Sequence, residues 1–458
     1  MNDPLTAPVT RRTVVVTGAS GNVASGVLRA LAQQFPDAEI VGVCRRPPTL
    51  GRIYERVRWH AVDLSAADAA TKLGPAMAGA DVVIHLALAT QPVRNADYLY
   101  RANVLGTAAV LQAMHNAGIE QLVYASSLGV YAPGAPAPVD ETWPDTGQQS
   151  STYSRHKVLV ERMLDDYETD HPGTSVARFR PTVVVQREAA ALIRSLYLGP
   201  LVPRAVLQAL HRGRLPLLPL PAGLALQFVH ADDVGDAVVR LMERRAVGSF
   251  NIAADALDRR AIADLVGARP VEVNAGLVRA AIGVLSATRL VALTTGWYDV
   301  ATATPVMDTT RARNELGWVP SRSSAQAAHE LLDGLASGAV GTSAAMGRKE
   351  EKRMSARTTV DRIHDASLAL WSALTLARAL GFGRAGVADA AVIAVNLASG
   401  TPMAIDRVRQ RRRDPAALLA PVAVTAALAA TRRGGWSPVI ATSVLNVLAA
   451  FECRRTVG

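Results

Sequence analysis

Residues 13–26 read TVVVTGASGNVASG, and this stretch decides the fold of the chain. Thr13 to Val16 is a short β-branched run of the kind found in buried parallel strands. Gly18 and Gly21 follow at once, and a helical pattern begins at Val23. A strand, a glycine turn and a helix in this order are typical of a dinucleotide-binding turn, in which backbone N–H groups at the helix start face the pyrophosphate. An ordinary strand-to-helix turn has the same pattern, so the rest of the chain must decide between the two.

Length and composition bound the possible classes of protein. A chain of 458 residues is too long for one compact core, so we expect two or three units. Its two cysteines lie far apart and its nine histidines are scattered, which predicts neither a disulfide framework nor a metal site. The apolar run after Arg12 is broken by Gly18, so it does not resemble a secretory signal, and we expect a cytoplasmic N-terminus.

The net charge of +10 is unevenly distributed along the chain. From residue 348 to the end there are 17 Lys and Arg against 8 Asp and Glu, which accounts for nearly all of it. The part of the chain that precedes residue 348 is close to neutral. The high isoelectric point therefore does not predict nucleic-acid binding by this part.

Further apolar runs alternate with helical patterns after the first helix. Asn95 to Asn116 has helical periodicity, and Gly118 is a plausible stop. Strands alternating with helices predict an α/β fold with a doubly wound parallel sheet, a Rossmann-type sheet, whose ligands bind beyond the carboxyl ends of the strands. The four further strands are predicted at Glu39 to Val43, Val57 to Val62, Asp81 to Leu86 and Gln121 to Ala125.

Arg45 and Arg46 follow the second predicted strand, at the position where the adenosine ribose of a dinucleotide would lie. An acidic residue there accepts a hydrogen bond from a 2′-hydroxyl, whereas arginine accommodates a 2′-phosphate. Two arginines and no acid stand there, which favours NADP over NAD. Solvated loop charge is the alternative interpretation of both arginines.

Tyr153 and Lys157 lie four residues apart in a helical pattern, so they share one face of the helix. An ammonium near a phenol lowers the phenol pKa and makes it a better proton acceptor. Ser127, at the end of the fifth predicted strand, is placed to hydrogen-bond a substrate oxygen. Together they predict hydride transfer at an alcohol or carbonyl carbon beside a nicotinamide.

Several motifs in order make the chain resemble the extended short-chain dehydrogenase/reductases, the NAD-dependent epimerase/dehydratase family, from about Arg12 to Gly338. The resemblance implies that Tyr153 is the acid/base, that Lys157 lowers its pKa and binds the ribose, and that Ser127 orients the substrate, with Ser126 as the alternative. It also implies a dimer through 95–116 and 151–170. The motifs are Thr17 to Gly21, Asp63-Leu64, His85 to Ala87, Asn103 to Thr107, Ser126-Ser127 with Val130-Tyr131, Tyr153 to Lys157, Arg180-Pro181, Phe228 to Val234 and Asp308 to Trp318. The cofactor-binding residues it implies, with the arginines above, are Gly18, Ser20, Gly21, Asn22, Val23, Arg45, Arg46, Asp63, Leu64, His85, Ala87, Asn103, Tyr153 and Lys157.

Three departures from the family pattern limit the prediction of the substrate. Ala24 replaces the third glycine, and Leu128-Gly129 stands where sugar dehydratases carry an acidic pair, which disfavours dehydration. Thr182 to Glu188 stands where sugar-nucleotide enzymes usually carry an Asn and a Tyr-Gly-Pro turn, and Leu192 to Leu226 is rich in Leu and Pro and apolar. An apolar carbonyl or alcohol, a sugar nucleotide turned over by an epimerase with tightly bound NAD, and a non-catalytic nucleotide-sensing scaffold all remain open.

The C-terminal quarter has a different composition. We expect the catalytic domain over 1–338, with a cofactor part at about 12–180 and a substrate part at about 181–338, and then a linker and charged stretch over 339–362. Four apolar segments over 363–458, with basic clusters between them, predict a four-helix domain that anchors the enzyme to the inner face of a membrane. A soluble alanine-rich helical bundle is the alternative.

Overall fold

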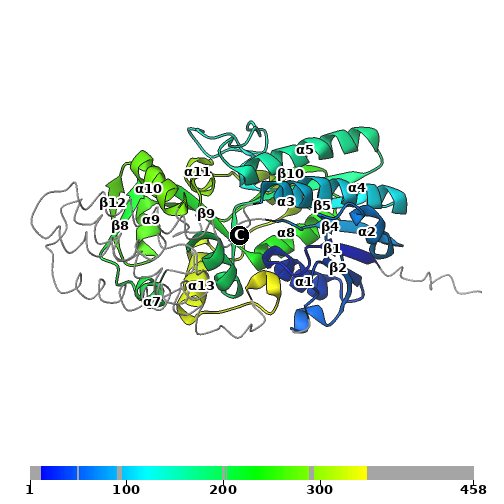
Figure 1. Cartoon of the computed structure of the whole chain (residues 1–458), viewed down its shortest axis with the longest axis horizontal. Helices are drawn as coiled ribbons and strands as arrows, with labels where there is room; N and C mark the ends of the chain where they lie inside the picture. The colour runs from blue at the N-terminus through cyan, green and yellow to red at the C-terminus, as the bar shows by residue number, and fades with distance from the viewer. Residues whose placement is uncertain are drawn as a thin grey trace, which may run out of the picture. The chain divides into compact units, whose positions relative to one another are not determined.

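Seven strands form one large parallel sheet in the computed structural model, which describes residues 12–48, 51–89, 95–198, 202, 204–287 and 293–347 (Figure 1). The seven strands have the order β10-β6-β5-β4-β1-β2-β3, and every neighbouring pair is parallel. The strand order reverses between β1 and β4, which is where doubly wound sheets bind ligands. The strands are β1 (Thr13–Thr17), β2 (Glu39–Cys44), β3 (Val57–Ala61), β4 (Val82–His85), β5 (Gln121–Ala125), β6 (Ser175–Pro181) and β10 (Gly248–Ile252). The predicted doubly wound sheet and its first five strands are confirmed.

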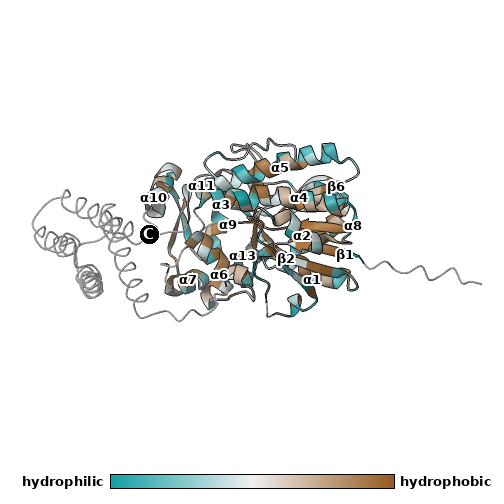
Figure 2. Cartoon of the chain, turned by 45° about the vertical axis from the view of Figure 1, so that its right-hand side comes forward, coloured by the Kyte–Doolittle hydropathy of each residue, from teal (hydrophilic) through white to brown (hydrophobic). Residues whose placement is uncertain are grey.

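Helices cover both faces of this sheet because side chains alternate along each strand. Val14 and Val16 of β1 pack on one side with α1 (Asn22–Gln34) and α8 (Ala231–Glu243). Val15 packs on the other side with α2 (Ala69–Met77), α4 (Gly106–Ala117) and α5 (Thr152–Asp170). Figure 2 shows the hydrophobic residues concentrated on the strands between these helices.

The helix expected over 95–116 is divided into three pieces. The pieces are α3 (Ala96–Tyr100), a π-helical turn (Arg101–Leu105) and α4. Gly118 ends α4 in a left-handed conformation with φ +68°, as its place in the sequence predicts.

Residues after 180 form a second, smaller part, but not as one continuous piece. They build a mixed three-stranded sheet, a two-stranded parallel sheet and several helices, yet β10 and α8 return to the large sheet. The large sheet crosses the expected boundary near residue 180, because its sixth and seventh strands, β6 and β10, are separated by more than sixty residues. The additional elements are β7 (Val183–Val185), α6 (Ala190–Ile193), a π-helical turn (Arg194–Leu198), α7 (Arg204–His211), β8 (Leu217–Pro221), β9 (Ala225–His230), β11 (Ala256–Asp258), α9 (Arg259–Asp264), β12 (Arg269–Val273), α10 (Ala275–Ala287), α11 (Thr295–Ala303), α12 (Thr310–Leu316) and α13 (Ser324–Ser337). Short 3-10 turns lie at Arg52–Tyr54, Leu128–Val130, Arg187–Ala189 and Ala344–Met346.

Residues 339–347, which we call the return segment, were expected to begin a linker but pack back onto the domain. The Ser343 hydroxyl donates a hydrogen bond of 2.6 Å to the carbonyl of Ser20 in the glycine turn. Ser343 and Met346 are only 1% and 2% exposed. The small residues that look like a linker in sequence therefore belong to the folded unit, because they allow the chain to pass close to the turn.

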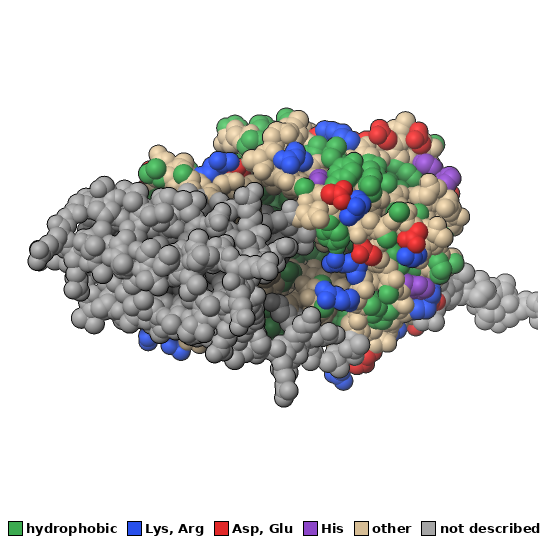
Figure 3. Space-filling model, in the orientation of Figure 1, with side chains coloured by type: hydrophobic (Ala, Val, Ile, Leu, Met, Phe, Trp, Pro, Cys, Tyr) green, Lys and Arg blue, Asp and Glu red, His purple; other side chains and the backbone are tan. Residues whose placement is uncertain are grey.

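The four apolar segments predicted over 363–458 lie outside the described residues. Within the part of the chain that the structure describes, none of the helices has the length and hydropathy needed to cross a membrane. Acidic and basic side chains are mixed on the face of this part that Figure 3 shows, in keeping with its near-neutral charge.

Candidate active site

The glycine turn between β1 and α1 has the geometry that a dinucleotide requires. Gly18 adopts φ +68°, and a Cβ there would lie 2.7 Å from the backbone of Ala87 on the neighbouring segment. Gly21 is the N-cap of α1, where no side chain caps the helix and no acid lies in its first turn. The positive end of a 13-residue helix thus faces the turn without a competing anion, so this turn fits a pyrophosphate group.

The first residues of α1 are tied to the smaller part of the protein through Gln186. Asn22 donates to the carbonyl of Val184 at 2.8 Å, and its side-chain oxygen accepts from Gln186 Nε2 at 2.6 Å. Gln186 is 1% exposed and also reaches the hydroxyl of Ser25. It stands within the segment that departs from the sugar-nucleotide pattern, and the structure shows that this departure connects the glycine turn to β7. Val23 packs partly buried against the core.

The arginines expected at the ribose lie exposed at the end of β2. The Arg45 guanidinium donates to the hydroxyl of Tyr98 and lies 6.0 Å from the centre of its ring. Burial would raise the pKa of Asp63, but hydrogen bonds from Ser65 and the nearby charge of Arg45 lower it. Arg45 and Asp63 are therefore close enough to interact, at the edge where the ribose and the adenine were predicted. Leu64 is buried against Gly106, and the structure brings no contact between Arg46 and these groups within the described residues.

His85 is a structural residue in this arrangement. Thr107 donates its hydroxyl proton to the carbonyl of Asn103, so it accepts from His85 Nε2, 3.0 Å away. Thr17 then donates to His85 Nδ1 at 2.5 Å. Both ring nitrogens are thus bonded inside the protein, and burial lowers the pKa of His85 to about 3. The side chain joins β1, β4 and α4 and presents no ring nitrogen to a cofactor, although Ala87 backbone borders the glycine turn.

Asn103 connects the chain after β4 to the helix that carries Tyr153. Its side-chain oxygen accepts from Ala89 N at 2.7 Å and its amide donates to Ala89 O at 2.8 Å. The same amide lies 3.4 Å from His156 Nδ1, on α5 between Tyr153 and Lys157.

Ser127, Tyr153 and Lys157 come together at the carboxyl end of β5. Ser127 is 2% exposed, its hydroxyl accepts from Gly129 N at 3.0 Å, and its side chain lies close enough to the Tyr153 phenol to lower the pKa of that phenol. A Cβ at Gly129 would lie 3.1 Å from the Tyr153 ring, so the chain at this glycine packs closely against the phenol. Ser126, the alternative to Ser127, instead donates to the buried carboxylate of Glu161.

The electrostatics of the pair differ from the expectation that Lys157 lowers the Tyr153 pKa. The Lys157 ammonium donates to the Tyr124 hydroxyl at 3.1 Å and to the carbonyl of Ala125. Burial raises the pKa of Tyr153 to about 12, opposed by the nearby Ser127 side chain and not by Lys157. Burial also lowers the pKa of Lys157 to about 7, while the Glu161 carboxylate acts in the opposite direction. Tyr153 is therefore a protonated phenol at neutral pH.

Two aromatic residues beside Tyr153 were not found from the sequence. Trp297 on α11 stacks against Tyr153, with ring centres 4.6 Å apart and planes inclined by 26°. Tyr197 meets Trp297 edge-on at 5.6 Å. No local pattern could have joined residues 153, 197 and 297, because they come from three separate elements.

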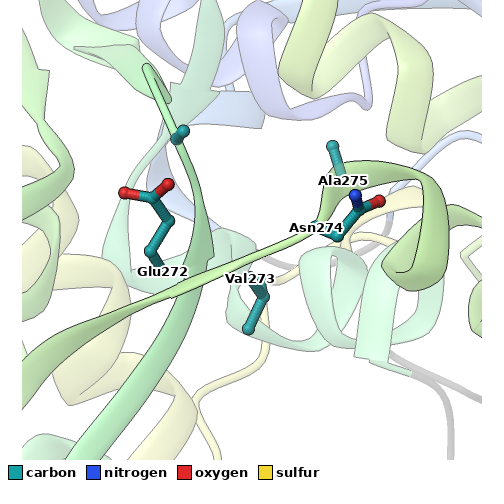
Figure 4. Close-up of a pocket in the computed structure, with 5 residues that line it drawn as sticks. Glu272, Val273, Asn274 and Ala275 are labelled. Carbon is teal, nitrogen blue, oxygen red and sulfur yellow. The ribbon is translucent and has the colours of Figure 1, made fainter.

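A cavity of about 420 Å³ lies in the smaller part, lined by the residue that follows β8 and by the end of β12 with the residues after it. Figure 4 shows that the carboxylate of Glu272 and the amide of Asn274 do not converge on one point there. The lining contains none of the predicted site residues. It consists of Ala222, Glu272, Val273, Asn274 and Ala275.

Curated relatives of the chain include both sugar-nucleotide enzymes and a ketoreductase. The dTDP-D-glucose 4,6-dehydratase of Mus musculus is 25% identical over 253 residues, covering 52% of this chain and 67% of the relative. The 4-hydroxy-2-methyl-3-oxo-4-farnesyl-3,4-dihydroquinoline-1-oxide ketoreductase of Stigmatella aurantiaca is 30% identical over 192 residues, covering 40% and 53%. The UDP-glucose 4-epimerase of Yersinia pestis is 30% identical over 176 residues, covering 36% and 52%. The chain thus spans about half the length of the last two relatives.

Solved structures with the same fold include one whose protein has NAD bound. The terminal R domain of the myxalamid biosynthetic pathway has a TM-score of 0.57 at 19% identity, covering 72% of this chain and 92% of that domain. The UDP-glucose-4-epimerase of Stenotrophomonas maltophila, with bound NAD and formylated UDP-arabinopyranose, has a TM-score of 0.54 at 21% identity, covering 72% and 99%.

The family of the chain follows from a match that is independent of these single relatives. A sequence model of the NAD dependent epimerase/dehydratase family matches residues 14–253, which is more than half of the 458 residues. The matched region contains the glycine turn, Ser127, Tyr153 and Lys157. The chain is therefore an enzyme of the NAD-dependent epimerase/dehydratase family, of the extended short-chain dehydrogenase/reductase type.

Proposed function

We propose that the protein is an NAD(P)-dependent oxidoreductase that interconverts a carbonyl and an alcohol at Ser127 and Tyr153. The observation that carries the proposal is the position of the buried Ser127, at the carboxyl end of β5, next to Gly129, which packs against the Tyr153 ring. The uncapped glycine turn at the start of α1 supports a dinucleotide beside them. A bound reduced nicotinamide supplies a hydride there.

The high pKa of Tyr153 suits this side chain to donate a proton. A phenol with a pKa of about 12 carries its proton at neutral pH, so Tyr153 can donate that proton to a carbonyl oxygen. Ser127 holds the oxygen in position. The carbonyl carbon accepts the hydride and its two electrons, the oxygen accepts the Tyr153 proton, and the dinucleotide is oxidised. The product is an alcohol.

Two observations bear on the substrate. The ketoreductase relative and the epimerase relative are both 30% identical to this chain over their alignments, so reduction and epimerisation are both supported by similarity. Leu128 and Gly129 follow Ser127 in place of an acidic pair, and Gly129 packs against the Tyr153 ring, so dehydration is not proposed. Reduction is the first candidate, and epimerisation, which uses the same hydride and proton transfer in both directions, is the second.

The proton transfer is tested with Tyr153→Phe in the full chain. Turnover of a panel of ketones, aldehydes and UDP-sugars should fall by at least about 100-fold, because the proton donor is lost. Dinucleotide affinity, measured by titration, should stay within about twofold of wild type, because the ring remains. Tyr167→Phe, at the far end of the same helix, is the matched control and should leave both values unchanged. Retained turnover in Tyr153→Phe would overturn the mechanism, and dinucleotide binding without any turnover by wild type would favour a scaffold.

The preference for NADP is a separate proposal that rests on Arg45 and Arg46. We expect NADPH to bind more tightly than NADH when the two are titrated side by side, because the guanidinium groups are exposed where the 2′-phosphate would lie. The double variant Arg45→Ala/Arg46→Ala should remove this difference and leave NADH affinity nearly unchanged. Equal affinities in wild type would contradict the preference and agree with the NAD named in the family description.

A further inference from the structure

The Tyr153 ring is part of an aromatic cluster that the fold assembles from three elements. Trp297 of α11 stacks on it at 4.6 Å, and Tyr197 of the π-helical turn lies perpendicular to Trp297 at 5.6 Å. All three side chains are partly exposed and none belongs to the fully buried core. A substrate whose oxygen reaches the Tyr153 hydroxyl must therefore lie near these rings.

The helix that carries Trp297 is firmly placed against the start of α5. A Cβ on Gly296 would lie 2.6 Å from the carbonyl of Ser150, so α11 approaches the chain just before α5 very closely. Ser150 donates to Asp299 at 2.6 Å, and Asp299 also accepts two hydrogen bonds from Arg279. Trp297 is thus held beside Tyr153 by contacts on both sides of it in the sequence.

Two of the four arginines that could meet a diphosphate, which are Arg187, Arg194, Arg204 and Arg212, are engaged within the smaller part, as is Arg279. Arg187 pairs with Asp333 at 2.7 Å, and Arg279 pairs with Asp299 at 2.7 Å. Arg194, one helical turn before Tyr197, donates to the carbonyl of Val202 at 2.8 Å. Binding a sugar nucleotide through these groups would require breaking existing bonds, whereas an apolar ring requires none of them.

We propose that Trp297 and Tyr197 form an aromatic wall that selects substrates whose reacting carbonyl belongs to, or adjoins, a flat apolar ring. This inference rests on the proposed function, because the wall acts only on a substrate that is reduced at Tyr153. Aromatic rings gain affinity from offset-stacked and edge-to-face contacts beyond the area they bury. Trp297 and Tyr197 are then specificity residues that act through binding, and Ser127 and Tyr153 perform the chemistry.

The inference is tested in the full chain with 1-tetralone, a fused-ring ketone, and 2-heptanone, an open-chain ketone. Trp297→Leu should raise the KM for 1-tetralone about three- to tenfold, the range expected for one lost aromatic pair, and change that for 2-heptanone by about twofold or less. Trp297→Phe should restore most of the affinity, and Tyr197→Leu should have a smaller effect in the same direction. Trp59→Leu, on the edge strand β3, is the matched control and should leave both KM values unchanged.

The outcomes separate this inference from the proposed function. Loss of turnover in Tyr153→Phe together with an equal change for both ketones in Trp297→Leu would overturn the aromatic wall and leave the oxidoreductase standing. Preference of the wild type for UDP-glucose or 2-heptanone over 1-tetralone, or failure to bind 1-tetralone at all, would also overturn it. Turnover that persists in Tyr153→Phe would overturn the proposed function first.

Discussion

The imidazole of His85 lies between the hydroxyls of Thr17 and Thr107, at the centre of the sheet and 1% exposed. Each of its two ring nitrogens has a defined hydrogen-bonding role, so the ring must stay neutral for both bonds to persist. A buried neutral histidine makes the folded state sensitive to acid, because the unfolded chain can bind a proton that the folded chain does not accept.

We predict that His85 contributes to loss of stability in mild acid. Its pKa in the folded protein, about 3, lies below the ordinary 6.5, so the stability it contributes is fully present above pH 6.5 and is lost as the pH falls toward 3. His85→Phe should be less stable than wild type by roughly 1–3 kcal/mol at pH 7.5, because two threonine hydroxyls lose their partner. The difference should shrink by about 2.7 kcal/mol at pH 4.5, enough to change its sign over most of that range, since two pH units below 6.5 correspond to about 1.36 kcal/mol each.

Urea unfolding at both pH values measures this difference. His329→Phe, an exposed histidine on α13, is the control and should show little change at either pH. A His85→Phe deficit that is equal at pH 7.5 and pH 4.5 would show that protonation of His85 does not limit stability.

At the scale of elements, helices α1 and α8 cross so closely that neither Gly26 nor Gly235 has room for a Cβ atom. A Cβ on Gly26 would lie 1.9 Å from the carbonyl of Ala231, and one on Gly235 would lie 2.3 Å from the carbonyl of Gly26. Backbone atoms rather than flexible side chains form these contacts, so neither helix can yield without moving as a whole. The third glycine of the fingerprint, replaced by Ala24, is thus not the position where the packing is tightest.

We predict that Gly26→Ala destabilises the fold by roughly 2–3 kcal/mol or more, because α1 and α8 must separate. Gly74→Ala is the matched control, since Gly74 lies inside α2 and a Cβ there meets nothing within 4 Å. That control should change stability by no more than about 1 kcal/mol, because the better helix propensity of alanine is opposed by Pro75, which disfavours helical backbone in the residue before it. Thermal and urea unfolding of both variants measure the difference, and similar stabilities would refute the close crossing.

At the scale of the whole molecule, the return segment links the end of the described chain to its beginning. Ser343 reaches Ser20 across 323 residues of sequence, directly at the glycine turn. Residues 339–347 therefore belong to the folded domain, and they contribute to the conformation of the cofactor turn.

We predict that Ser343→Ala lowers stability by about 1–2 kcal/mol, because the carbonyl of Ser20 loses a buried donor. Dinucleotide affinity should fall by a few-fold as well, since the turn is held less firmly. Ser195→Ala, which removes an exposed hydroxyl bonded within its own helix, should change neither quantity. Calorimetric titration with the dinucleotide measures the affinity, and urea unfolding measures the stability. Unchanged affinity in Ser343→Ala would show that the return segment does not contribute to dinucleotide binding.

Local patterns were sufficient for much of this protein. The β-branched run, Gly18 and the helix start specify a strand-turn-helix unit, because each depends on neighbouring residues only. The spacing of Tyr153 and Lys157 likewise places them on one face of α5 whatever surrounds them. The alternation of strands and helices then leaves the doubly wound sheet as the fold, and the order of motifs identifies the family.

Tertiary structure alone decided what those residues contact. Burial and distant partners determine that Lys157 bonds Tyr124 and Ala125, and that Tyr153 stays protonated. The stacking of Trp297 on Tyr153 joins residues from separate elements, which no local pattern encodes. The sequence by itself thus determined the fold, the glycine turn and the catalytic candidates, because these follow from local spacing. Their pKa values and the aromatic surroundings were decided only by the folded chain, because desolvation and packing are properties of residues brought together from far apart.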